Sequence, residues 1–138
     1  MFLAVTKDSG GVQPWEYLTA GAGVYQVGQL LKLDGELGCY DDNPITVMPQ
    51  YLCMAKEDIP EGEFKAIPVV RITGDTVFET VCETDGLVPG NRYAVFGSGA
   101  VSKDTEGAFE IKDVLDGAVH GRFVAVGQAA AVAVNEEA

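Results

Sequence analysis

Short apolar runs separated by turn-forming residues dominate the chain. The runs are rich in β-branched and aromatic residues, and 17 glycines and six prolines punctuate the sequence. No run reaches the length of an ordinary helix, so the pattern predicts strands joined by turns. The predicted strands are Phe2–Thr6, Tyr17–Ala20, Gln29–Leu33, Leu37–Tyr40, Thr46–Met48, Tyr51–Ala55, Phe64–Ile72, Thr76–Cys82, Arg92–Phe96, Ala108–Lys112 and Val119–Gly127.

Two local features make sharper predictions. The pair Asp34-Gly35 lies between two apolar runs, which predicts a hairpin with a type I′ turn in which both residues have positive φ. Pro68 interrupts the run Ala66–Ile72. Because proline has no N–H to donate to a neighbouring strand, this run is expected at a sheet edge or at a bulge.

The chain ends and one charged segment are the least strand-like parts. Ala129–Val134 is alanine-rich but too short for a stable helix, so an extended arm is favoured. Glu57–Glu63 contains Pro60 and Gly62 and is expected to be a solvated loop. We therefore expect one β-domain over residues 1–138, with an N-terminal arm (1–14), a core (15–127) and a C-terminal tail (128–138).

A weak internal similarity divides the core into two halves. Gly28–Gly35 (GQLLKLDG) aligns with Gly90–Gly97 (GNRYAVFG) at an offset of 62 positions. In each half a second strand, a polar turn and a longer final strand follow. Either the chain contains two related β-units that close on one another, or glycine-rich hairpins simply look alike. The expected fold class is all-β: a small β-barrel or sandwich of short strands with extended N- and C-terminal arms.

Charge, hydropathy and cysteine content limit the partners and the compartment that the protein can have. The 21 acidic residues outnumber the nine basic ones, and the formal net charge of −12 repels nucleic acid and anionic membranes. The longest uncharged apolar stretch, Phe123–Val134, is shorter than the roughly 20 residues of a membrane span. The start of the chain lacks the pattern of a signal peptide. Three cysteines without a CxxC pair indicate buried reduced thiols, with an intermolecular disulfide as the alternative.

No arrangement of residues predicts catalysis, a metal or a cofactor. Gly97-Ser98-Gly99 lacks the glycines two positions either side of serine that a nucleophile elbow needs. Asp41-Asp42-Asn43 lacks the ligand spacing of a calcium loop and fits an Asx turn. Glu79 and Glu83 share a strand face but stand about 13 Å apart, too far for a glycosidase pair. His120, the single histidine, is expected at the surface or in a pH-sensitive interface.

Four segments over residues 3–81 carry a resemblance to a known group. They are LAVTKDSGGVQPWEYLTAGAG, YQVGQLLKLDGELG, YLCMAKEDIPEGEFKAIPVVRI and TGDTVFET. The shared pattern is a Trp-Glu-Tyr, a VGQ strand with a DG turn, a PV-x-R strand and an FET strand. In these features the chain resembles the small capsid decoration proteins, also called cement or auxiliary head proteins, of tailed phages and prophages.

The resemblance implies a structural role and no enzymatic activity. Such a protein is made in the host cytoplasm, binds the major capsid protein on the virion exterior, often as a homotrimer, and strengthens the shell. The alternative is the base of a head fibre, or a host-surface adhesion or display protein. In this reading Trp15 and Tyr17 are interface anchors, Tyr25 is a further interface residue, and the arm adds Phe2, Leu3 and Val5 as a strand to the capsid protein or a neighbouring copy. The alternative for the three early aromatic residues is packing in the core.

Overall fold

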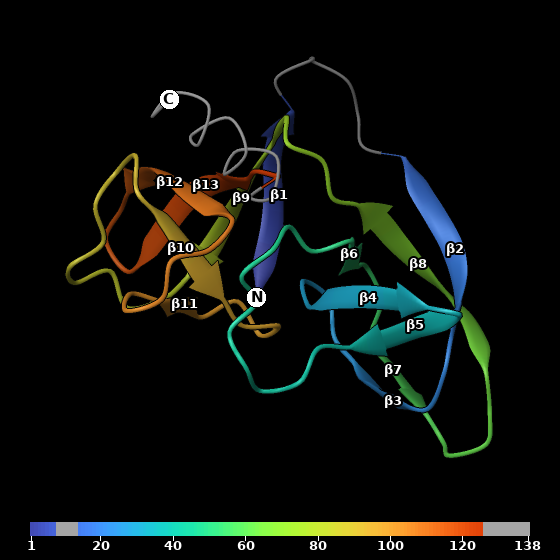
Figure 1. The fold of residues 1–138 in the computed structure, drawn as a ribbon. Coiled ribbons are helices and arrows are strands. Elements are labelled where there is room, and N and C mark those ends of the chain that lie inside the picture. The colour runs from blue at the N-terminus through green and yellow to red at the C-terminus, as the bar shows by residue number, and fades with distance from the viewer. Residues whose placement is uncertain (8–13, 126–138) are drawn as a thin grey trace, which may run out of the picture.

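The described chain is all-β, as predicted. The computed structural model describes residues 1–7 and 14–125, and the strands in these ranges form a closed barrel, a six-stranded sheet and a two-stranded ribbon (Figure 1). No helix within these ranges is long and apolar enough to cross a membrane. The strands are β1 (Phe2–Lys7), β2 (Trp15–Ala20), β3 (Gly23–Tyr25), β4 (Leu30–Asp34), β5 (Glu36–Cys39), β6 (Tyr51–Cys53), β7 (Glu57–Ile59), β8 (Lys65–Arg71), β9 (Thr76–Val81), β10 (Arg92–Val95), β11 (Val101–Ser102), β12 (Phe109–Val114) and β13 (Ala118–Phe123).

The barrel closes on itself in the order β2-β5-β4-β6-β8. Its strands pair antiparallel except at β2 and β5, which meet in parallel at Ala20 and Leu37. One residue in two along each strand points inward, which follows from the alternation of side chains across a strand. The interior side chains are Ala20, Tyr25, Leu31, Leu37, Tyr51, Cys53, Ile59, Ile67 and Val69.

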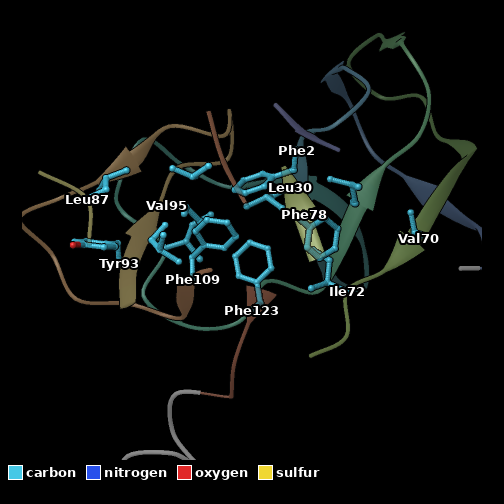
Figure 2. Packing of buried hydrophobic residues seen from close by; sticks show 14 residues of the cluster. Phe2, Leu30, Val70, Ile72, Phe78, Leu87, Tyr93, Val95, Phe109 and Phe123 are labelled. Atoms are coloured by element: carbon cyan, nitrogen blue, oxygen red, sulfur yellow. The ribbon is translucent and has the colours of Figure 1, made fainter. Parts of the chain in front are cut away.

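The six-stranded sheet has the order β1-β9-β13-β12-β10-β11 and shares a second core with the barrel. Four phenylalanine rings, Phe2, Phe78, Phe109 and Phe123, form the centre of this core (Figure 2). Their centroids lie 5.0–6.3 Å apart in mostly edge-on arrangements, which aromatic rings prefer. Barrel residues such as Leu30 join the same cluster, so the two parts pack into one body.

The strand orders reveal an internal repeat. The barrel unit consists of β2, β4, β5, β6 and β8, and the sheet unit of β9, β10, β11, β12 and β13. If the strands of each unit are numbered in chain order, both units have the same spatial order: third, second, fourth, fifth, first. The aligned segments Gly28–Gly35 and Gly90–Gly97 contain β4 and β10, the second strand of each unit. The predicted pair of related units is therefore confirmed. The barrel unit closes into a ring because β5 reaches β2, whereas the sheet unit stays open because the two-residue β11 pairs only with β10; the two units pack on one another through the shared core.

The expected N-terminal arm is instead part of the sheet. Strand β1 pairs antiparallel with β9, and the Phe2 amide donates a hydrogen bond to the Gly28 carbonyl at 2.8 Å. Phe2 is only 3% exposed. The prediction of an arm over residues 1–14 is thus wrong for Phe2–Lys7, because burying a phenyl ring and pairing an open strand edge both favour docking. The tail, 128–138, lies outside the described residues.

The predicted hairpin forms with a different turn. Strands β4 and β5 pair from Leu31 and Cys39 down to Asp34 and Glu36, with Gly35 alone between them. Of the two turn residues, Gly35 has a positive φ of +75° and Asp34 does not, so the type I′ assignment is wrong. Asp34 keeps an extended conformation within the ladder, and glycine alone takes the left-handed conformation because it has no Cβ.

Pro68 does not mark a sheet edge. Strand β8 pairs with β2 on one side and with β6 on the other, inside the closed barrel. The Pro68 carbonyl accepts a hydrogen bond from the Met54 amide at 3.0 Å, just past the end of β6. Since N and O of one residue point the same way in an antiparallel strand, the proline nitrogen faces the point where the β6 ladder ends. The missing N–H therefore costs little there.

Two other local predictions differ from the structure. Thr46–Met48 forms no strand, and only the adjacent Ile45 makes a single bridge to Val95. Within the predicted loop Glu57–Glu63, the residues Glu57–Ile59 form β7, which pairs with β3. Strands β3 and β7 are each three residues long and are formed by pairing with one another across a long sequence separation, so no local pattern specifies them.

Candidate interaction surface

An uncharged aromatic strip covers the outside of the barrel on β2 and β8. Trp15 and Tyr17 lie two residues apart on the outward face of β2 and are 54% and 67% exposed. The register sets Tyr17 opposite Pro68 and Thr19 opposite Ala66. Phe64, two residues before Ala66, is 61% exposed. We call this set the β2–β8 strip: Trp15, Tyr17, Thr19, Phe64, Ala66 and Pro68.

Ion pairs border the strip at both ends. Arg71 donates to the two carboxylate oxygens of Glu16 at 3.2 Å, and its guanidinium lies 5.4 Å from the centre of the Tyr51 ring. At the other end, Lys65 Nζ lies 2.8 Å from Glu57 Oε1. Exposed pairs of this kind add little stability, but they neutralise the charges nearest the strip. A partner covering the strip would therefore desolvate mainly aromatic and aliphatic surface.

The structure divides the predicted interface residues into two groups. Leu3, Trp15 and Tyr17 are exposed, whereas Phe2 and Tyr25 are buried in the two cores. Tyr25 donates its hydroxyl to the Gly21 carbonyl at 2.8 Å inside the barrel, and desolvation raises the pKa of this phenol. Phe2 and Tyr25, both expected at an interface, are thus core residues of the described chain. Val5 falls at a register shift between Ala4 and Thr6 in the pairing of β1 with β9, and its side chain lies outside the described part.

A second exposed face lies on the sheet unit, at positions that correspond to the strip. Strands β9 and β13 occupy the places of β2 and β8 in the repeat. Here His120 Nε2 lies 2.9 Å from Glu79 Oε1, and Glu79 is paired in register with Leu3 of β1. Leu3 and Val81 are well exposed beside this pair. His120 is thus a partly exposed surface residue held by a carboxylate, the first of the two positions expected for it.

The pockets in the described structure are open to solvent. One of about 480 Å³ is lined by Gly90, Asn91, Arg92, Tyr93, Lys103, Asp104 and Glu106. Its two cations stand beside two carboxylates, so it presents no field of one sign. No group of three or more His, Cys, Asp or Glu side chains within residues 1–7 and 14–125 is arranged to hold a metal. Asp41 accepts a hydrogen bond from the Asn43 amide at 3.0 Å, which confirms the predicted Asx turn.

The three cysteines are free thiols. Cys53 is buried, and Cys39 and Cys82 are half-buried. Burial raises the pKa of each thiol, so all three are weaker nucleophiles at neutral pH than an exposed cysteine. The predicted burial is confirmed for Cys53 and is partial for Cys39 and Cys82.

Comparison with known proteins identifies no relative of this chain. No protein-family model matches the chain, and no curated protein matches it significantly. The strip and the sheet face are therefore interpreted from their own chemistry.

Proposed function

We propose that this protein binds the outer surface of a phage capsid and stabilises the shell as a decoration protein. The observation that carries the proposal is the β2–β8 strip. Trp15, Tyr17 and Phe64 expose over half of their side chains on a protein of net charge −12. Together the three rings present roughly 400 Å² of aromatic surface, which is the size of the largest apolar patch on many monomers, and such patches are often functional. Aromatic residues are also enriched among those that dominate binding energy.

The proposed partner is the major capsid protein. The strip is uncharged and bordered by ion pairs, so it suits a flat apolar surface and does not need a basic one. The rest of the surface is strongly acidic, which keeps bound copies soluble and away from encapsidated DNA. The resemblance over residues 3–81 supports the same assignment.

Stabilisation follows from mass action. A protein that binds the assembled lattice but not free subunits stabilises the lattice in proportion to RT ln(1 + [L]/Kd). Assembly into a trimer, the oligomer implied by the resemblance, would present three strips at once. Simultaneous contacts raise the overall affinity by effective concentration, so a strip of modest area is sufficient.

The test adds purified protein to capsids that lack it. Sedimentation measures the copies bound per shell, and heating measures the temperature at which DNA is released. We expect saturable, stoichiometric binding and a higher release temperature. Tyr17→Asp should abolish binding, because it places a charge in the strip. Val24→Asp is the matched control: Val24 is also an exposed strand residue, but on β3.

Each remaining outcome counts against the proposal. Binding without a change in release temperature would favour the base of a head fibre or a host-surface adhesion or display role. Equal binding by Tyr17→Asp and by the unaltered protein would exclude the strip as the contact. No binding would exclude the virion exterior as the site of action.

A further inference from the structure

The wall of the barrel is open along most of one strand. Strand β2 pairs with β8 over its whole length, but with β5 only where Ala20 meets Leu37. Strand β5 begins at Glu36 and runs parallel to β2, so it lies beside the end of β2 only. Among the described residues, no strand pairs with this side of β2 before Ala20. In the described structure the stretch from Trp15 to Leu18 is therefore a free strand edge, and β2 lies at the right border of the molecule in Figure 1.

The register shows which backbone groups lie on this edge. The Pro68 carbonyl accepts the Met54 amide on the β6 side, so Pro68 and its β2 partner Tyr17 form a pair without hydrogen bonds between them. The N–H and C=O of Tyr17 therefore point away from β8, and those of Trp15, two residues earlier, point the same way. Gly21 follows the same alternation, and its amide donates to β5 across this side at 3.2 Å. The backbone donors and acceptors of two β2 residues thus face outward in the plane of the sheet.

The residues with outward-facing backbone groups are also the exposed aromatic residues of the β2–β8 strip, Trp15 and Tyr17. A strand added at this edge would place alternate side chains beside the two rings, at cross-strand distances of about 5 Å. Backbone hydrogen bonds give an added strand its affinity, and its alternate side chains give specificity. Proteins protect unused edges with prolines, lysines or bulges, and Trp15–Ala20 contains none of these. The free edge is therefore competent to pair.

We propose that the free edge of β2 takes an extended segment of the capsid protein as an additional strand. This inference rests on the proposed function, which names the capsid protein as the partner of the strip. Charge selects the segment, because the protein carries −12 and the exposed Glu61 and Glu63 lie near Phe64 at one end of the strip. An acidic segment, or a second copy of this chain, is repelled. The segment is therefore neutral or basic, has β-branched or aromatic residues at alternate positions, and has no proline that faces β2.

The experiment uses the full-length protein and overlapping short peptides that together cover the capsid protein. Trp15 is the single tryptophan of the chain, so its fluorescence reports on this edge when the peptides carry phenylalanine in place of any tryptophan. We expect one peptide to bind saturably and to shift the emission of Trp15 to shorter wavelength, because the added strand removes water from the indole ring.

Methylation of the peptide backbone gives the decisive comparison. Successive N–H groups of a strand point to opposite sides, so only every second amide of the bound peptide faces β2. Methyl groups on two amides of that set should weaken binding about tenfold, whereas methyl groups on the intervening set should leave it nearly unchanged. Tyr17→Pro and Tyr17→Ala are the matched variants of the protein: both lose the ring, but only proline also loses the N–H, so Tyr17→Pro should bind about fivefold more weakly than Tyr17→Ala.

The other outcomes contradict the proposal in different ways. If both methylated sets, or neither, weaken binding, the peptide does not bind as a strand. If no peptide binds although whole capsids bind the protein, the strip contacts a folded surface, so the inference is wrong and the proposed function stands. If capsids do not bind either, the proposed function fails as well. A shift of Trp15 emission with protein concentration alone would mean that a second copy occupies the edge.

Discussion

Replacing Phe2 with alanine tests whether the N-terminus is structural. Phe2 is 3% exposed and its ring contacts Phe78, Phe109 and Phe123 (Figure 2). Truncating a buried phenylalanine removes its transfer free energy and leaves a cavity, and such substitutions cost about 3–5 kcal/mol. Since small domains are stable by only about 5–15 kcal/mol, this single change should remove a large share of the free energy of unfolding.

The assay is equilibrium unfolding in urea at several protein concentrations. With a slope of about 2 kcal/mol per molar urea, the expected loss lowers the midpoint by roughly 1.5–2.5 M. Leu3→Ala is the matched control, because Leu3 is next along the same strand but 59% exposed, and its effect should stay within about 0.5 kcal/mol. A loss below about 1 kcal/mol for Phe2→Ala would refute the packing of β1 and restore the free arm expected from the sequence.

Three further predictions concern single positions and use the same urea assay. Gly107→Ala should cost about 1–3 kcal/mol, because its Cβ would lie 2.4 Å from the Ala94 Cα, whereas Gly38→Ala, with open space around it, should be nearly neutral; equal effects would contradict this packing. Gly35→Ala should cost about 1 kcal/mol, because φ is +75° there, and no loss would show that the turn can rearrange. Burial holds the pKa of the Cys53 thiol above its ordinary value of about 9, so the unfolded chain ionises first and stability should fall as the pH rises through about 9. Cys53→Ala should lessen that fall, and an unchanged pH profile would exclude a contribution from this thiol.

Local pattern alone determined the class of fold and most strand positions. Alternation of apolar and polar residues over four to seven positions is a property of the strand itself, so it predicts β4, β8 and β9 without knowledge of their partners. Gly35 marks a hairpin for an equally local reason, because only glycine tolerates the conformation that the turn needs. The repeated pattern around Gly28–Gly35 and Gly90–Gly97 also predicted two related units.

Tertiary structure decided which apolar residues are buried. Tyr17 and Tyr25 look alike in sequence, yet Tyr17 faces outward on β2 while Tyr25 fills the barrel, because closure of the ring fixes which face of each strand is inside. Phe2 reads as part of a terminal arm until the open edge of β9 and the three phenyl rings are in place. The alternation of residues within one strand is the same whichever face is buried. Which face is buried is therefore decided by pairing with strands that are distant in the sequence.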